Sequence, residues 1–338
     1  MIPCPSSSES WYNHPELVRI FSYFMTAVVF PLHLLGAYCI LKHSPSTMSS
    51  VKWTILNLHF WNTLTDLLMN VLVIPCPLLP KVAGYMLGVF SAIGVPATVQ
   101  TWIIAEALSF VSVATTMIFE NRFYLLVSQK TKWKMCRPFW IMGNFVFCLV
   151  FVIPMMVQLP DQEMATKIVL NDLPCVPNFL LTIELVVPTL DGYVFIYTSI
   201  LFSVVVFGQL FIFTIILSHQ LSNNFGANNL SSTTRRLQRN LLKALILQTG
   251  VPFVYLLLPV TSAVFAVSTG YFNLAFNNLA IMVTSFHGMI STSSMILIHQ
   301  PYRKVVISML QRRKKAETSG TTVEMFTRST PVESSAGS

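Results

Sequence analysis

Charged residues are scarce in this chain of 338 residues, because Asp, Glu, Lys and Arg together make up 10% of it. Soluble domains carry about 25% charged residues, so the composition excludes an ordinary soluble globular protein. Hydrophobic residues account for 54% of the chain, and its mean hydropathy is +0.64. Much of the surface must therefore face lipid, and we predict an integral membrane protein.

Catalytic and cofactor-binding motifs are also missing. The chain contains no His-Glu-x-x-His, no Gly-x-Ser-x-Gly and no glycine-rich phosphate loop. Its 7 histidines are scattered over separate segments without the spacing of metal ligands. We therefore expect no enzymatic activity, no metal site and no cofactor.

Long apolar runs dominate the sequence instead. A helix needs roughly 20 apolar residues to cross the bilayer, and single strands cannot cross it because lipid offers their backbone groups no hydrogen bonds. The runs lie at 17–41, 54–74, 94–119, 139–157, 194–217, 243–267 and 275–298. The expected fold is an all-α bundle of seven transmembrane helices. The first 16 residues lack the basic region of a cleavable signal peptide, so we expect the first run to remain as an anchor.

Lysine and arginine are distributed unevenly between the two sides of this bundle. Of the 21 basic residues, only Arg19, Lys81 and Lys167 fall on the side of the amino terminus. Basic residues favour the cytoplasmic side, so we predict an exterior amino terminus and a cytoplasmic carboxyl terminus. The net charge of +8 then reflects a positive inner face that faces the lipid bilayer, and it requires no nucleic acid. The sequon at Asn229 would face the cytosol and stay unglycosylated.

The predicted topology divides the chain into four parts. A short extracellular segment is followed by the seven-helix domain, then by a basic amphipathic helix on the membrane surface, and then by a disordered Ser/Thr-rich tail. In order, they span residues 1–16, 17–298, 299–316 and 317–338.

Two acids, Asp66 and Glu106, lie within the apolar runs, where a charge is costly and therefore a functional candidate. Asp66 belongs to a polar helical face, and Glu106 is aligned with Trp102 on another. The first face consists of His59, Asn62, Asp66 and Asn70. These faces should turn into the bundle, where they would form the floor of a ligand cavity, or a cation or proton site. Alternatively they make interhelical hydrogen bonds, worth about 0.6 kcal/mol each.

The outer halves of the last three runs offer further polar groups for a small-molecule pocket, and the tyrosines among them could instead form an interfacial aromatic belt. Pro252 and Pro259 would kink the sixth run, either as a hinge or without gating anything. The predicted ligand-binding residues are Asp66, Asn70, Trp102, Glu106, Tyr197, Tyr255 and Asn277.

The third run ends in Glu120, Asn121 and Arg122 on the predicted cytoplasmic side. This end resembles the Asp-Arg-Tyr of G-protein-coupled receptors, although here the arginine follows the acid by two residues. Arg122 could alternatively only anchor the helix at the lipid headgroups. Together with the basic residues at the base of the sixth run, these residues form the predicted G-protein-coupling surface: Glu120, Asn121, Arg122, Arg235, Arg236 and Arg239.

Seven short motifs occur in a distinctive order. They are SPSTMSSVKWTILNLHFW (44–61), PKVAGYMLGVFSAIGVP (80–96), IFENR (118–122), PDQ (160–162), LPCVP (173–177), KALILQTGVPFVYLLLP (243–259) and ILIHQPYRK (296–304). Together they resemble the nematode serpentine receptor class H, a family of chemosensory receptors, over residues 15–310. The resemblance implies seven helices, a heterotrimeric G protein as partner, and a place in the plasma membrane of sensory neurons, with the cilium as one candidate site and olfaction as one sense. It implies no particular ligand.

Two other functions are compatible with an apolar bundle of helices. The last run, 275–298, contains no lysine, which excludes a retinal-binding opsin. A seven-helix ion channel or a small-solute transporter remains the alternative to a receptor for a small-molecule ligand. The predicted exterior amino terminus and the presence of only two intramembrane acids argue against it.

Cysteines on the predicted exterior side meet oxidising conditions. There are three, Cys4, Cys76 and Cys175. Cys76 lies at the exterior end of the second predicted helix and Cys175 in the second exterior loop, so we expect a disulfide between them that leaves Cys4 free.

Overall fold

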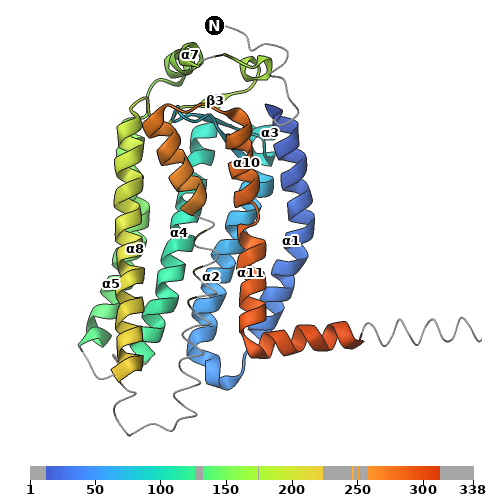
Figure 1. The fold of residues 1–338 in the computed structure, drawn as a ribbon, viewed down its shortest axis with the longest axis vertical. Coiled ribbons are helices and arrows are strands. Elements are labelled where there is room, and N and C mark those ends of the chain that lie inside the picture. Colours follow the sequence, from blue (N-terminus) through green and yellow to red (C-terminus); the bar gives the residue numbers. More distant parts are fainter. Residues whose placement is uncertain are drawn as a thin grey trace, which may run out of the picture.

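A computed structural model describes residues 13–125, 132–173, 175–223, 246, 250, 254 and 257–312. Long helices run side by side along the length of the molecule (Figure 1). One end carries a small β-sheet, and we call it the sheet end. From the other end a helix over residues 300–312 projects across the bundle direction, and we call this the tail end.

The long helices run between these two ends, and shorter ones extend or connect them. They are α1 (Pro15–His43), α2 (Ser49–Leu67), α3 (Val89–Ala92), α4 (Ala97–Phe123), α5 (Trp133–Phe151), α6 (Ile153–Val157), α7 (Gln162–Asp172), α8 (Gly192–Asn223), Leu257–Thr269, α10 (Leu274–Thr284) and α11 (His287–Ile298). A π-helical turn, η4 (Leu68–Leu72), continues α2, and 3-10 turns lie at Ser46–Met48 and Asn178–Leu181.

Five described spans are long and apolar enough to cross a membrane: Pro15–His43, Ala97–Phe123, Trp133–Val157, Gly192–Gln220 and Leu274–Ile298. α2 is less apolar because it carries the polar face that includes Asp66, and η4 extends it to Leu72. The sixth span is described at residues 246, 250, 254 and 257–269. The predicted all-α bundle of seven transmembrane helices is confirmed, with boundaries shifted by a few residues.

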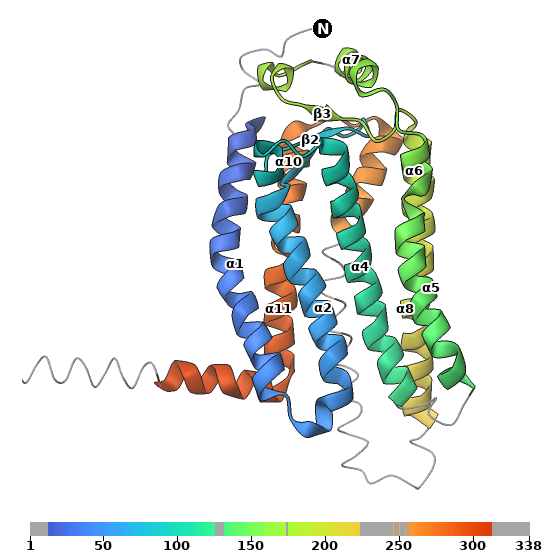
Figure 2. The same ribbon diagram turned by 180° about the vertical axis from the view of Figure 1, so that it is seen from behind.

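Burial distinguishes central helices from peripheral ones. In the most apolar 18-residue stretch of α4, 56% of the residues are buried, against 17% in that of α8. α4 packs against α2, α5 and α8, and α1 packs against α2 and α11; Figure 2 shows α1, α2, α4 and α5 in sequence from behind. α4 is therefore the most buried of the five spans.

A small antiparallel sheet covers the sheet end. It consists of β1 (Pro75–Pro77), β2 (Gly84–Met86) and β3 (Leu185–Val186), with Tyr85 facing both Cys76 and Leu185. Tyr85 is fully buried in a hydrophobic cluster that also takes in α7 and the start of α1. The connecting segments at this end are thus a packed cap above the helices.

The helix 300–312 is anchored to the first helix at the tail end. Tyr302 is fully buried, and its hydroxyl lies 2.7 Å from that of Ser44. Its ring packs in a cluster with Ile40 and Met295. Of the predicted surface helix 299–316 the structure describes the part to residue 312. The predicted tail 317–338 and most of the predicted segment 1–16 lie outside the described residues.

Candidate functional site

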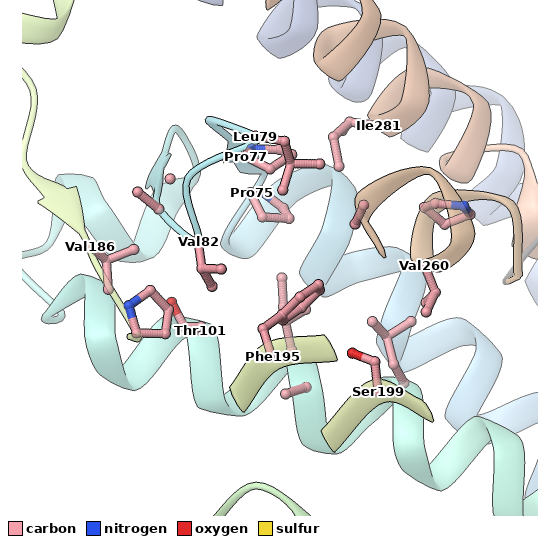
Figure 3. A pocket seen from close by; sticks show the side chains of 18 of the residues that line it. Pro75, Pro77, Leu79, Val82, Thr101, Val186, Phe195, Ser199, Val260 and Ile281 are labelled. Atoms are coloured by element: carbon pink, nitrogen blue, oxygen red, sulfur yellow. The ribbon is translucent and has the colours of Figure 1, made fainter. Parts of the chain in front are cut away.

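A cavity of about 360 Å³ lies under the sheet, between the outer halves of the helices. β1 and the hairpin that follows it form its roof, with Val186 of β3 at one side (Figure 3). Thr101 of α4, Phe195 and Ser199 of α8, Val260 and Ile281 surround it. Its size falls within the range of small-molecule pockets, about 300–1,000 Å³.

The described lining of this cavity is apolar and contains no charged side chain. Its polar members are neutral: Thr101, Trp102, Thr198, Ser199, Ser262, Asn277 and Thr284. Several already have partners, since Asn277 Nδ2 donates to the Leu79 carbonyl at 3.1 Å and Thr284 Oγ1 donates to Ala280 O at 2.7 Å. A buried charge without a partner is costly, so the cavity suits a neutral, largely apolar molecule.

The structure brings only some of the predicted ligand-binding residues to this cavity. Trp102 and Asn277 line it. Tyr197 is 69% exposed on the outer surface of the bundle and does not line it, and neither does Glu106, whose Oε2 is buried with no hydrogen-bond partner in the described part of the chain. Tyr255 lies outside the described residues.

Asp66 and Asn70 lie elsewhere, in a polar cluster between α1, α2 and α11. The Asp66 carboxylate is 2.8 Å from His33 Nε2, and Thr292 Oγ1 is 2.9 Å from the other ring nitrogen of His33. His287 Nδ1 stands 3.9 Å from Asp66, and Asn70 Nδ2 donates to the Asp66 carbonyl. The predicted polar face of the second span does turn inward, and the Asp66 carboxylate contacts residues of other helices.

Close helix packing shapes this cluster. A Cβ atom at Gly288 would overlap the Asp66 carboxylate, and one at Gly36 would lie 2.9 Å from His59 Cε1. Only glycine therefore lets these helices approach so closely.

The sequence analysis did not select His33 and His287, because the spacing of histidines in separate runs does not reveal that they converge. Each is an ionisable residue inside an apolar run, and that was the signal that could have identified it.

At the tail end, Glu120 pairs with α5. Its carboxylate, on a residue that is 1% exposed, accepts a hydrogen bond from Trp133 Nε1 at 2.9 Å and lies 3.0 Å from Arg137 Nε. Arg137 also donates to Asn121 Oδ1 at 3.1 Å and stacks on the ring of Tyr124. Arg137 is thus the partner of Glu120, and sequence reasoning gave it no such role.

Arg122 lies half-buried near His299, the residue that follows α11. Burial, and then the positive charge of Arg122, lower the pKa of His299 to about 4. Arg122 Nε is buried and has no hydrogen-bond partner among the residues described. Arg235, Arg236 and Arg239, predicted to complete this surface, lie outside the described residues.

The predicted disulfide between Cys76 and Cys175 is wrong. Cys175 is disulfide-bonded, whereas Cys76 is a free cysteine, 1% exposed in β1 against Tyr85. Burial raises the pKa of the Cys76 thiol to about 12. The strand pairing places Cys76 opposite Tyr85 in the hydrophobic cluster of the cap, where its thiol is buried. Cys4 lies outside the described residues.

Comparison with known proteins agrees with this architecture. The family model described as "Serpentine type 7TM GPCR chemoreceptor Srh" matches residues 13–312. A Caenorhabditis elegans protein, "Serpentine receptor class H-72", is 25% identical over 296 residues, which cover 85% of this chain and 83% of that protein. A multi-pass bundle of this kind resides in the plasma membrane. The chain belongs to the Srh family of serpentine, seven-transmembrane chemoreceptors.

Proposed function

We propose that this chemoreceptor binds a small neutral molecule in the cavity at the sheet end and signals to a heterotrimeric G protein at the tail end. The observation that carries the proposal is the roofed cavity of about 360 Å³ with its neutral lining. Trp102 and Asn277 are the predicted residues that remain in the proposed site.

The bundle offers a route between the two ends. α4 contributes Thr101 and Trp102 to the cavity and carries Glu120 and Arg122 at its far end, about 30 Å away at 1.5 Å per residue. Pro259 and Val260 place the sixth span in the cavity wall as well. A ligand that binds better when these helices are rearranged would shift the equilibrium toward that arrangement.

Arg122 is the residue we place at the G-protein contact. Its guanidinium is half-buried and not paired with Glu120, which is held by Arg137. Arg122 therefore keeps hydrogen-bonding capacity at the end of α4, where a cleft between the helices would expose it. In this proposal the sheet end faces the exterior and the tail end faces the cytoplasm.

The test measures guanine-nucleotide exchange on a purified G protein with the full-length receptor in nanodiscs, screened with small neutral alcohols, ketones and esters. Ala105→Phe fills the cavity that Ala105 lines and should abolish both ligand binding and exchange. Ala27→Phe, on the exposed face of α1, is the matched control and should change neither.

Arg122→Ala should keep ligand binding and surface expression but lose evoked exchange. Normal exchange from Arg122→Ala would remove the role assigned to this residue. Ligand binding that survives Ala105→Phe would remove the cavity from the proposal. An evoked ionic current without nucleotide exchange would favour a channel.

A further inference from the structure

A second cavity of about 170 Å³ continues the first toward the middle of the bundle. The two share several lining residues, among them Ala105, Ser199 and Val260. Ser109, which lines the second cavity, lies about 18 Å along α4 from Ala97. The two cavities therefore form neighbouring lobes, one under the sheet and one near mid-membrane.

The second lobe differs from the first in its polar groups. Four serines line it, Ser109 and Ser112 on α4 and Ser199 and Ser203 on α8, and its other described lining residues are apolar. Ser109 and Ser112 are 2% and 8% exposed. We call this second cavity the serine lobe.

Three of these four hydroxyls already donate a hydrogen bond to a backbone carbonyl. Ser109 Oγ donates to Ala105 O at 2.7 Å, Ser112 Oγ to Leu108 O at 3.0 Å, and Ser203 Oγ to Ser199 O at 2.7 Å. A serine hydroxyl has one proton and two lone pairs, so these three can only accept a further hydrogen bond. The hydroxyl of Ser199, at the junction of the lobes, makes no hydrogen bond to the described residues, so it can donate one to a ligand.

We propose that the ligand is an amphipathic alcohol whose hydroxyl occupies the serine lobe and whose apolar part fills the cavity under the sheet. This inference rests on the proposed function and names its ligand class. An alcohol hydroxyl donates one hydrogen bond, which a serine lone pair accepts, and it accepts one, which Ser199 can give. An ether lacks the proton, an alkane lacks both functions, and an ionised amine or carboxylate would be buried without a counter-charge.

The lobe also touches the parts of the bundle that would have to move. Leu257 and Val260 of the sixth span line it together with Phe202 and Phe207 of α8. A hydroxyl bound here would sit between α4, α8 and the sixth span. Recognition of the polar end would therefore be coupled to the helices that connect the two ends of the receptor.

The experiment uses the full chain in nanodiscs and three probes with the same number of heavy atoms: n-octanol, heptyl methyl ether and n-nonane. Binding is measured by the shift in unfolding temperature over a probe titration. One hydrogen bond is worth about 1 kcal/mol, so octanol should bind about five- to tenfold more tightly than the ether. Partition of each probe into the lipid is the same for every variant, so comparison between variants cancels it.

Variants then locate the preference for the alcohol. Combined Ser109→Ala and Ser112→Ala should reduce it to about twofold or less while leaving the affinity for the ether unchanged. Ser268→Ala is the matched control, because Ser268 makes the same bond to Val264 O, at 2.7 Å, on an exposed face. It should leave the preference intact.

The outcomes separate the inference from the proposed function. Equal binding of octanol and the ether, or a preference that survives the serine variants, would overturn the alcohol assignment; the cavity would still stand as the site if Ala105→Phe removed binding of both probes. Absence of octanol binding would overturn the alcohol assignment alone, and binding of these probes that is indifferent to Ala105→Phe would overturn both.

Discussion

Single residues decide how closely α11 approaches α2. The Asp66 carboxylate lies where a Cβ on Gly288 would be, and His33 holds that carboxylate at 2.8 Å. Gly288→Ala must displace the carboxylate from His33 or push the helices apart. Overpacking of this kind costs typically about 1–3 kcal/mol, so we expect a lower unfolding temperature of the receptor in nanodiscs.

Gly143→Ala provides the opposite case. A Cβ at Gly143 in α5 meets no atom within 4 Å, and alanine favours a helix over glycine by about 1 kcal/mol. The same substitution should therefore leave the unfolding temperature unchanged or raise it. If Gly288→Ala were as stable as the wild type, the close packing of α2 on α11 would be disproved.

At the scale of elements, the ion pair between Arg137 and Glu120 links α5 to the end of α4. Arg137→Ala would leave the Glu120 carboxylate buried without its counter-charge, which is strongly destabilising for a buried pair; the loss is moderated here because the Arg137 side chain is 25% exposed. We expect a lower unfolding temperature and altered nucleotide exchange.

A double-mutant cycle isolates this contact. Glu120→Gln removes the charge and keeps an acceptor for Trp133 Nε1, so Arg137→Ala should cost less in that background. We expect a coupling free energy of about 0.5–3 kcal/mol. Equal costs in both backgrounds would mean that the ion pair does not stabilise the end of α4.

The helices could be predicted from the sequence, whereas most contacts between them could not. The lengths of the apolar runs predict the helices well, because in lipid the backbone groups of each span must hydrogen-bond to one another. The helical spacing of the polar residues in α2 likewise predicts its buried polar face. The pairing of Glu120 with Arg137 could not be predicted, since it depends on how two separate helices pack. The β1 strand carries two prolines, which usually argue against a strand, so the sheet and the burial of Cys76 in it were equally hidden. A cavity is space between elements, and no local pattern encodes it.

Over the whole molecule, charge is divided between the two ends more strongly than a count suggests. The three basic residues of the sheet end each pair with an acid: Arg19 with Glu16, Lys81 with Asp172 and Lys167 with Glu163. At the tail end the described basic residues include Lys42, Lys52, Lys132, Lys134, Arg303 and Lys304, and Glu120 is the acid described there, bound to Arg137. Unneutralised positive charge thus gathers at the tail end, where anionic lipid of the inner leaflet would attract it.

We therefore predict that the sheet end is exterior and the tail end cytoplasmic. In cells, a tag on the amino terminus should be labelled without permeabilisation, and a tag on the carboxyl terminus only after it. Met164→Asn creates the sequon Asn-Ala-Thr with Ala165 and Thr166 on α7, where Met164 is 65% exposed. This new site should be glycosylated, whereas Asn229 should not.

Sugar on Asn229, or an amino terminus accessible only after permeabilisation, would put Glu120, Arg122 and Arg137 outside the cell. A G protein could not then reach the end of α4, and the proposed signalling would fail, although both cavities would remain as they are. The topology measurement therefore tests the signalling half of the proposal independently of the ligand half.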